Sequence, residues 1–122
     1  QTLSHMHYWN VKLKRKACKE EVLAALKTST RIKLIRYDQG LVSNNTIKEM
    51  YLDMGRPWGD MYEVALWEDM LKVVVDELFY AYVVDNQAIV IPETIDAIRA
   101  LTGIENDGQK SIVKTNKSLG IN

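Results

Sequence analysis

Two histidines, His5 and His7, stand one residue apart near the start of the sequence and are its only histidines. Side chains two residues apart on a β-strand point to the same side, so both imidazoles could bind one metal ion. Zinc takes three or four protein ligands, however, and no CxxC or HExxH motif supplies the others. Two further interpretations stay open: packing on a half-buried strand, and general base catalysis, since imidazole titrates near neutral pH.

The only cysteine, Cys18, directly precedes a predicted helix start at KEEV. The helix dipole and the neighbouring Lys16 and Lys19 could activate a thiol at this position. The Gly-rich or strained turn that commonly presents a catalytic nucleophile is missing from this stretch. We therefore predict a structural or incidental thiol.

A third polar group, Asp85, Asn86 and Gln87, interrupts the apolar stretch that leads from a predicted strand into a helix. Three such residues form either a turn or a set of hydrogen-bonding groups directed into a cleft. The carboxamide of Asn86 offers both a donor and an acceptor, so it could pair with another amide.

The elements that position these residues follow from the hydrophobic periodicity. Residues 3–14 alternate as in a strand, and residues 19–27 show helical spacing. The sequence further predicts a strand over 31–37, a helix over 46–55 with Asn45 or Thr46 as N-cap, and a three-stranded antiparallel meander within 61–84. Helices follow from residue 91 and up to Gly120. This order, β-α-β-α-β-β-β-α-α, predicts an α+β fold in which helices cover one face of a mostly antiparallel sheet.

Composition limits the functional classes. Lys and Arg together number 16, as do Asp and Glu, so the formal net charge is zero. A surface that binds nucleic acid needs an excess of basic residues, and we expect none here. One cysteine suits a reducing compartment, and no signal peptide or membrane span is visible, so we expect a cytoplasmic protein without a membrane partner.

Three stretches are specific enough to compare with known families: TLSHMH (2–7), VIPETIDAIRAL (90–101) and KSIVKTNKSLGI (110–121). They resemble the C-terminal part of archaeal (type II) glyceraldehyde-3-phosphate dehydrogenases. The first is similar to that family's Thr-Leu-Met-His-x-His strand. The second is similar to its Val-Ile-Pro-Glu-Asn-Ile-Asp-Ala-Ile-Arg-Ala segment, and the third to its Ser-Ile-x-Lys-Thr-Asn-Lys-Ser-Leu-Gly-Ile tail. Order and spacing agree along the whole chain.

The resemblance implies a reaction, namely the oxidative phosphorylation of glyceraldehyde 3-phosphate to 1,3-bisphosphoglycerate with NAD or NADP. A Cys thiolate attacks the aldehyde, and a His accepts the hydroxyl proton of the hemithioacetal as hydride leaves for nicotinamide. Phosphate then resolves the thioester. The resemblance also implies a homo-oligomer, which is a tetramer in the family.

Residue by residue, the family's first histidine falls on His5, the implied catalytic base, and its second, more variable position falls on His7, implied to be structural. The family's His-Gln-Glu-Ser stretch falls on residues 85–88, so its cofactor-contacting Gln corresponds to Asn86. Here VDNQ departs from the pattern and looks more like the Tyr-Asp-Asn-Glu stretch of the bacterial and eukaryotic enzymes, whose Asn does the equivalent work. The amide is kept but is one methylene shorter.

Other motifs of the family have no counterpart in the sequence: the Ser-Cys-Asn-Thr-Thr nucleophile motif, which Cys18 does not match, the Gly-rich cofactor loop, the phosphate-binding His pair and the Arg pair. The resemblance implies that all lie upstream of Gln1, in a missing N-terminal half that binds the cofactor. Residues 1–91 are then expected to form part of the catalytic α+β domain. Residues 92–122 are expected to form helices that return to the cofactor-binding domain.

Two rival hypotheses remain. In the first, the chain is a catalytically inert interaction or assembly domain derived from that enzyme, with residues 61–84 building contacts between subunits. In the second, His5 and His7 form a metal site. In the leading hypothesis, the chain by itself is inactive because it supplies the base without the nucleophile.

Overall fold

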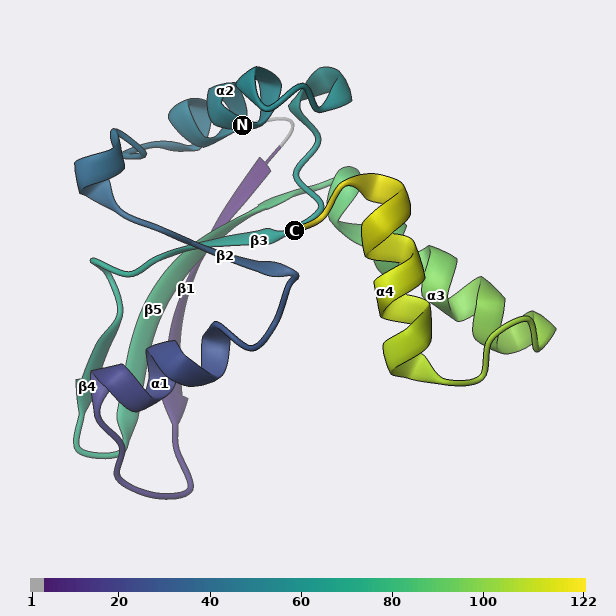
Figure 1. Ribbon diagram of the computed structural model, residues 1–122. Helices are drawn as coiled ribbons and strands as arrows, with labels where there is room; N and C mark the ends of the chain where they lie inside the picture. Colours follow the sequence, from purple (N-terminus) through teal and green to yellow (C-terminus); the bar gives the residue numbers. More distant parts are fainter. Residues whose placement is uncertain (1–3) are drawn as a thin grey trace.

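The computed structural model describes residues 4–122, and its helices and strands follow the predicted order (Figure 1). They are β1 (Ser4–Lys12), α1 (Lys19–Leu26), β2 (Ile32–Ile35), α2 (Asn44–Asp53), β3 (Val64–Trp67), β4 (Lys72–Val74), β5 (Glu77–Asp85), α3 (Ile91–Thr102) and α4 (Gly108–Leu119). Short 3-10 turns lie at Tyr37–Gln39 (η1), Pro57–Gly59 (η2) and Ala88–Val90 (η3). Leu3, the first residue of the predicted initial strand, lies outside the described residues.

The strands form one sheet in the order β1-β5-β3-β2, and β4 also pairs with β5. All pairings are antiparallel except the one between β2 and β3. The two long strands, β1 and β5, pair over nine residues each, from Ser4 opposite Asp85 to Lys12 opposite Glu77. This confirms the predicted α+β class with a mostly antiparallel sheet.

The predicted three-stranded meander is wrong. Strands β3 and β4 run in the same direction along the edge of β5 that β1 leaves open. Between the pairs Leu66–Tyr82 and Lys72–Phe79, the segment that joins β3 to β4 advances six residues, whereas β5 advances only three. Glu68 and Asp69 do lie in a turn, in which the Leu71 N–H donates to the Glu68 carbonyl oxygen at 3.3 Å, but this turn interrupts one edge of the sheet rather than reversing the chain.

The main core lies between one face of the sheet and α2. Ile47 and Tyr51 of α2 are fully buried against Ala65, Trp67 and Val83 of the strands. Ser43 caps this helix, because its Oγ accepts a hydrogen bond from the Thr46 N–H at 3.3 Å. The prediction of Asn45 or Thr46 as N-cap was therefore wrong by two to three residues, although Thr46 does complete the capping box as its third helical residue.

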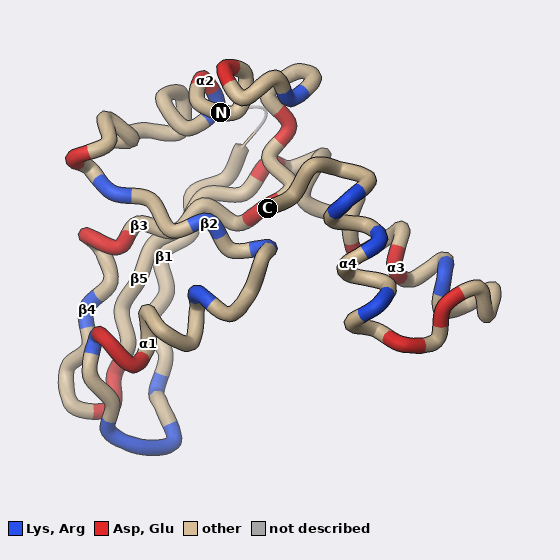
Figure 2. The backbone as a smooth tube through the Cα atoms, viewed as in Figure 1, with Lys and Arg blue, Asp and Glu red and all other residues tan. Residues whose placement is uncertain are grey.

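The remaining helices lie outside this main core. Helix α1 adds a cover over part of the opposite face, where Leu26 lies near Ile32 and Leu78. Helices α3 and α4 form an antiparallel hairpin that projects away from the strands (Figure 1). Basic and acidic residues are interspersed over most of the chain, but Lys14, Arg15 and Lys16 gather in the loop after β1 (Figure 2).

Candidate functional site

The structure places the two residues that the sequence singled out, His5 and Asn86, at the same end of neighbouring strands. His5 is the second residue of β1 and lies opposite Val84 of β5. Asn86 follows β5 directly, two residues beyond Val84. The His5 side chain is exposed and Asn86 is half-buried. An imidazole open to a substrate and a carboxamide therefore share one end of the sheet.

The two histidines differ in their surroundings. The His7 ring is half-buried and stacks on Tyr82, with ring centroids 5.1 Å apart and an interplanar angle of 5°. Tyr82 is held in turn by the Trp9 indole N–H, which donates to its hydroxyl at 3.1 Å. His5 lies beside His7 at the start of β1, and its ring is edge-on to that of His7 with 6.1 Å between the ring centroids. Packing thus occupies His7 and leaves the face of His5 accessible.

The polar stretch after β5 is a turn, as one of the two interpretations held. The Asp85 Oδ1 accepts hydrogen bonds from the backbone N–H groups of Gln87 at 2.9 Å and Ala88 at 3.0 Å. Its other oxygen, Oδ2, accepts from Lys48 Nζ of α2 at 2.7 Å. Burial by itself would raise the pKa of Asp85, but the Lys48 ammonium and the two N–H groups outweigh it and hold this pKa below its ordinary value.

Cys18 lies far from this end of the sheet. It is exposed and forms the N-cap of α1, where its backbone N–H donates to Glu21 Oε2 at 2.9 Å. The whole of β1 separates it from His5, which is roughly 20 Å of extended chain. The structure thus does not bring this thiol to the histidine that a hemithioacetal mechanism would pair with a thiolate.

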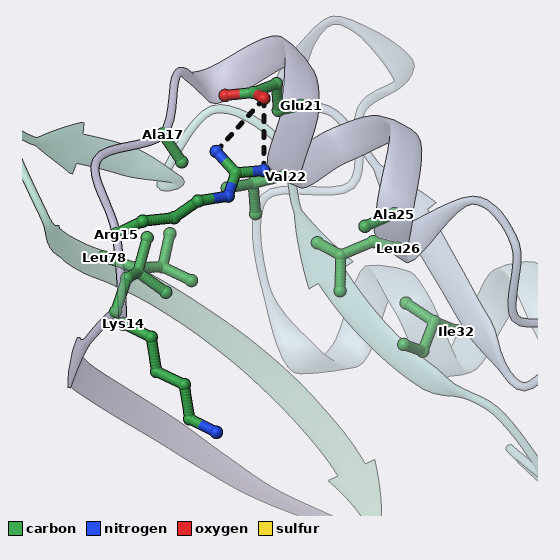
Figure 3. Close-up of a pocket in the computed structure, with 10 residues that line it drawn as sticks. Lys14, Arg15, Ala17, Glu21, Val22, Ala25, Leu26, Ile32 and Leu78 are labelled. Carbon is green, nitrogen blue, oxygen red and sulfur yellow. Dashed lines mark hydrogen bonds and ion pairs between the residues drawn. The ribbon is translucent and has the colours of Figure 1, made fainter.

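A cavity also lies at the far end, between α1 and the sheet. It measures about 400 Å³ and is mostly apolar, with Val22, Leu26 and Leu78 among its lining residues (Figure 3). Arg15 closes one side through its ion pair with Glu21 at 3.3 Å. This cavity is separate from the end of the sheet that holds His5 and Asn86.

Within residues 4–122, no group of three or more His, Cys, Asp or Glu side chains is placed to hold a metal ion. None of the helices in this part of the chain has the length and apolar character needed to cross a bilayer.

Three residues near the site were missed by the sequence reasoning: Ser4, Asn44 and Lys48. The Asn44 Nδ2 donates to Ser4 Oγ at 3.2 Å, and Lys48 contacts Asp85. The only sequence signal is the four-residue spacing of Asn44 and Lys48, which places both on one side of a helix. Which strands that side faces depends on the tertiary packing.

The arrangement suits proton transfer and amide recognition. The exposed imidazole of His5 can accept a proton from a hydroxyl group, and the Asn86 side-chain Nδ2 can donate to a second carboxamide, whereas Asn86 Oδ1 is buried. The nicotinamide end of a dinucleotide carries such a carboxamide, so the residues present fit that end of the cofactor. They offer no phosphate-binding loop for the remainder of it.

Comparison with known proteins gives a consistent assignment. No protein-family model matches the chain. It is 41% identical over 120 residues to glyceraldehyde-3-phosphate dehydrogenase of Methanothermobacter thermautotrophicus, an alignment that covers 98% of this chain and 36% of the relative. The corresponding enzyme of Metallosphaera sedula is 42% identical, and glyceraldehyde-3-phosphate dehydrogenase 2 of Methanosarcina barkeri is 39% identical, each with 98% of this chain and 35% of the relative covered. The chain is thus a homologue of archaeal glyceraldehyde-3-phosphate dehydrogenases that spans about a third of their length, as its motifs predict.

Proposed function

We propose that the chain is part of a phosphorylating, NAD(P)-dependent glyceraldehyde-3-phosphate dehydrogenase of the cytoplasm, to which it contributes a catalytic base and a nicotinamide-side amide. One observation carries the proposal. His5 and Asn86, which correspond to functional positions of the family, lie at the same end of the paired strands β1 and β5. The identity of about 40% to dehydrogenases over 98% of the chain supports it.

In this proposal, His5 accepts the hydroxyl proton of the hemithioacetal formed from glyceraldehyde 3-phosphate. A bound nicotinamide would supply the hydride acceptor that this oxidation needs. Asn86 would hold the nicotinamide end of the cofactor by donating a hydrogen bond from its side-chain amide. The thiolate comes from outside this chain, since Cys18 lies at the opposite end of β1.

A chimaera tests the proposal, with this chain replacing the matching third of the Methanothermobacter thermautotrophicus relative. We expect the chimaera to reduce NAD or NADP in the presence of glyceraldehyde 3-phosphate and phosphate. His5→Asn should lower its kcat by a factor of about 10² to 10⁴, the usual contribution of a general base. The matched control, His7→Asn, should have a much smaller effect, and equal losses from the two variants would contradict the assignment.

The 122-residue chain by itself should show no turnover in the same assay. Clear NAD(P)-dependent oxidation by the isolated chain would overturn the proposal that the nucleophile lies elsewhere. Both measurements use purified protein of verified intact mass, and His5→Asn purified in the same way reports any activity of a contaminating host dehydrogenase.

We also propose the domain division expected from the sequence, with residues 1–91 in the catalytic domain and residues 92–122 returning to the cofactor-binding domain. The exposed apolar side chains of the helical hairpin support this division: Ile98, Leu101, Ile104 and Val113. Leu101 is 87% exposed, so nothing within residues 4–122 covers it. Such a surface is typical of a site that contacts another domain.

Leu101→Glu tests the hairpin contact. The substitution should change the free energy of unfolding of the isolated chain by less than about 0.5 kcal/mol, because the site is exposed. In the chimaera it should lower the melting temperature by several degrees, since an apolar contact is lost. Asn106→Glu, in the loop between α3 and α4, is the control and should be neutral in both proteins. If Leu101→Glu leaves the melting temperature of the chimaera unchanged, that result would argue against the proposed domain division.

An assembly domain without catalysis is the second candidate, and one feature favours it. Strand β1 pairs only with β5 among the described strands, and Tyr8 and Trp9 on it are exposed. An apolar edge strand of this kind readily pairs with another chain. Sedimentation velocity over a wide concentration range discriminates: a monomer throughout would count against assembly, and against the homo-oligomer expected for the enzyme.

A further inference from the structure

Helix α2 contacts the ends of β1 and β5 through two polar side chains. Asn44 and Lys48 lie four residues apart and so project from the same side of the helix. Asn44 Nδ2 donates to Ser4 Oγ at 3.2 Å, and Lys48 Nζ donates to Asp85 Oδ2 at 2.7 Å. Ser4 and Asp85 are themselves directly opposite each other in the sheet. One helix thus holds both members of a cross-strand pair.

Each residue of this pair is the chain neighbour of a proposed functional residue. Ser4 immediately precedes His5, and Asp85 immediately precedes Asn86. Asp85 also accepts hydrogen bonds from the backbone N–H groups of Gln87 and Ala88, which fix the chain just beyond Asn86. The backbone around Asn86 is therefore held on both sides by one carboxylate, and that carboxylate is held by Lys48.

We infer that Asn44 and Lys48 act as positioning residues that set the relative placement of His5 and Asn86 through Ser4 and Asp85. We call these four residues the α2 clamp. The inference that the clamp affects catalysis rests on the proposed function. The inference that it fixes the relative placement of His5 and Asn86 does not. The clamp residues touch neither substrate nor cofactor in this proposal; they act through the residues that do.

The energetics favour a positioning role over a purely stabilising one. Helix α2 is already fixed to the sheet by Ile47 and Tyr51, both of which are completely buried. A buried ion pair contributes little net stability compared with apolar side chains of similar volume, because both charges lose their hydration. The Asp85 side chain is 5% exposed and that of Lys48 is 23% exposed. What this pair supplies beyond an apolar contact is a defined direction and distance.

Nuclear magnetic resonance on the isotope-labelled 122-residue chain tests the clamp without any cofactor. In Lys48→Met, the backbone order parameters of Asn86 and Gln87 should fall from about 0.85 toward 0.6, and the Asn86 side-chain amide signals should shift. Lys48→Arg keeps the charge and should restore both signals. The control, Lys110→Met on the exposed side of α4, should leave them unchanged.

Asn44→Ala gives an independent check at the other strand. It should broaden the imidazole signals of His5 while those of Asn86 stay in place, because Asn44 donates to Ser4, the chain neighbour of His5. If Lys48→Met lowers only global stability and leaves the Asn86 and His5 signals unaltered, the positioning role is overturned. Should Lys48→Met fail to fold, Asn44→Ala and Lys48→Arg decide the matter.

The chimaera then connects geometry with catalysis. Lys48→Met should lower kcat about tenfold or more with little change in the KM for glyceraldehyde 3-phosphate, and Lys48→Arg should recover most of the loss. An inactive parent chimaera would refute the proposed function while the resonance data still decide the clamp. If the chimaera is active and Lys48→Met leaves its kcat unchanged, the clamp is refuted but the proposed function is not.

Discussion

At the scale of single residues, Val75 carries a backbone conformation that its side chain disfavours. It has a φ of 61° in the two-residue turn between β4 and β5, which joins the pair Val74–Glu77. Hairpin turns of this kind place glycine at a position with positive φ, and a β-branched residue there is strained. The Val75 side chain is 59% exposed, so little packing compensates for the strain.

Val75→Gly should therefore raise the free energy of unfolding by about 1 kcal/mol, the lower end of the usual range for such strain. Urea unfolding followed by circular dichroism measures the change. Val74→Gly is the matched control: it lies in regular strand and should lower stability by roughly 0.5–1 kcal/mol. A loss of stability at both positions would show that Val75 is not strained in solution.

At the scale of elements, α3 and α4 are joined by a polar network rather than an apolar core. Ser111 and Thr115 of α4 donate to Asp96 Oδ1 of α3 at 2.6 and 2.7 Å, and Arg31 and Arg99 contact the same carboxylate. Pro92 is the only fully buried residue of α3. The hairpin therefore depends on one carboxylate for its internal geometry.

Asp96→Asn should lower the free energy of unfolding by about 2–3 kcal/mol, because several hydrogen bonds to a charged group are weakened together. Hydrogen exchange should accelerate in α3 and α4 before it does in the sheet. Glu93→Gln serves as comparison, since Glu93 also contacts Arg31 but is 70% exposed, and it should cost less than about 1 kcal/mol. Uniform acceleration across the whole chain would contradict the separate behaviour of the hairpin.

At the scale of the whole molecule, arginines connect the hairpin to the sheet. Arg31, just before β2, donates to Asp96 of α3. Arg56 forms a buried ion pair with Glu63 and donates to the Gly120 carbonyl oxygen, 3.2 Å away, at the end of α4. The fold is thus held at several points by buried carboxylates, which makes its stability sensitive to acid.

The pKa values of Asp85 and Asp96 are both lowered in the folded chain. Burial opposes ionisation at each, but Lys48 and backbone N–H groups outweigh it at Asp85, as Ser111, Thr115 and Arg31 do at Asp96. Because the unfolded pKa of Asp is about 3.9, the stabilisation is present above that pH and is lost as the pH falls through the lower folded values. Urea unfolding should therefore show a decline in stability below about pH 4.

The double variant Asp85→Asn and Asp96→Asn should be less stable at pH 7 and should vary less with pH in this acidic range. Its unfolding free energy, measured at intervals from pH 7 to pH 2, gives the comparison with the unaltered chain. Parallel curves for the two proteins would show that other carboxylates cause the acid sensitivity.

Much of the fold is predictable because it follows from local signals. Alternation identifies β1, helical spacing identifies α1 and α2, and Gly120 ends α4 where the sequence places it. The meander was wrong because Glu68 and Asp69 are suited equally to a turn that reverses the chain and to one that leaves the strand direction unchanged. Only the pairing of β3 and β4 with β5 distinguishes the two.

For the site, the sequence by itself made His5 a candidate base and Asn86 a candidate amide, and the family resemblance implied those roles. Tertiary structure decided that they share one end of the sheet, that His7 stacks on Tyr82 instead, and that Cys18 lies at the other end. It also revealed Asn44 and Lys48 as their neighbours. The reason is physical: residue type and spacing act over a few residues, whereas strand register and helix packing bring together positions about 40 to 80 residues apart.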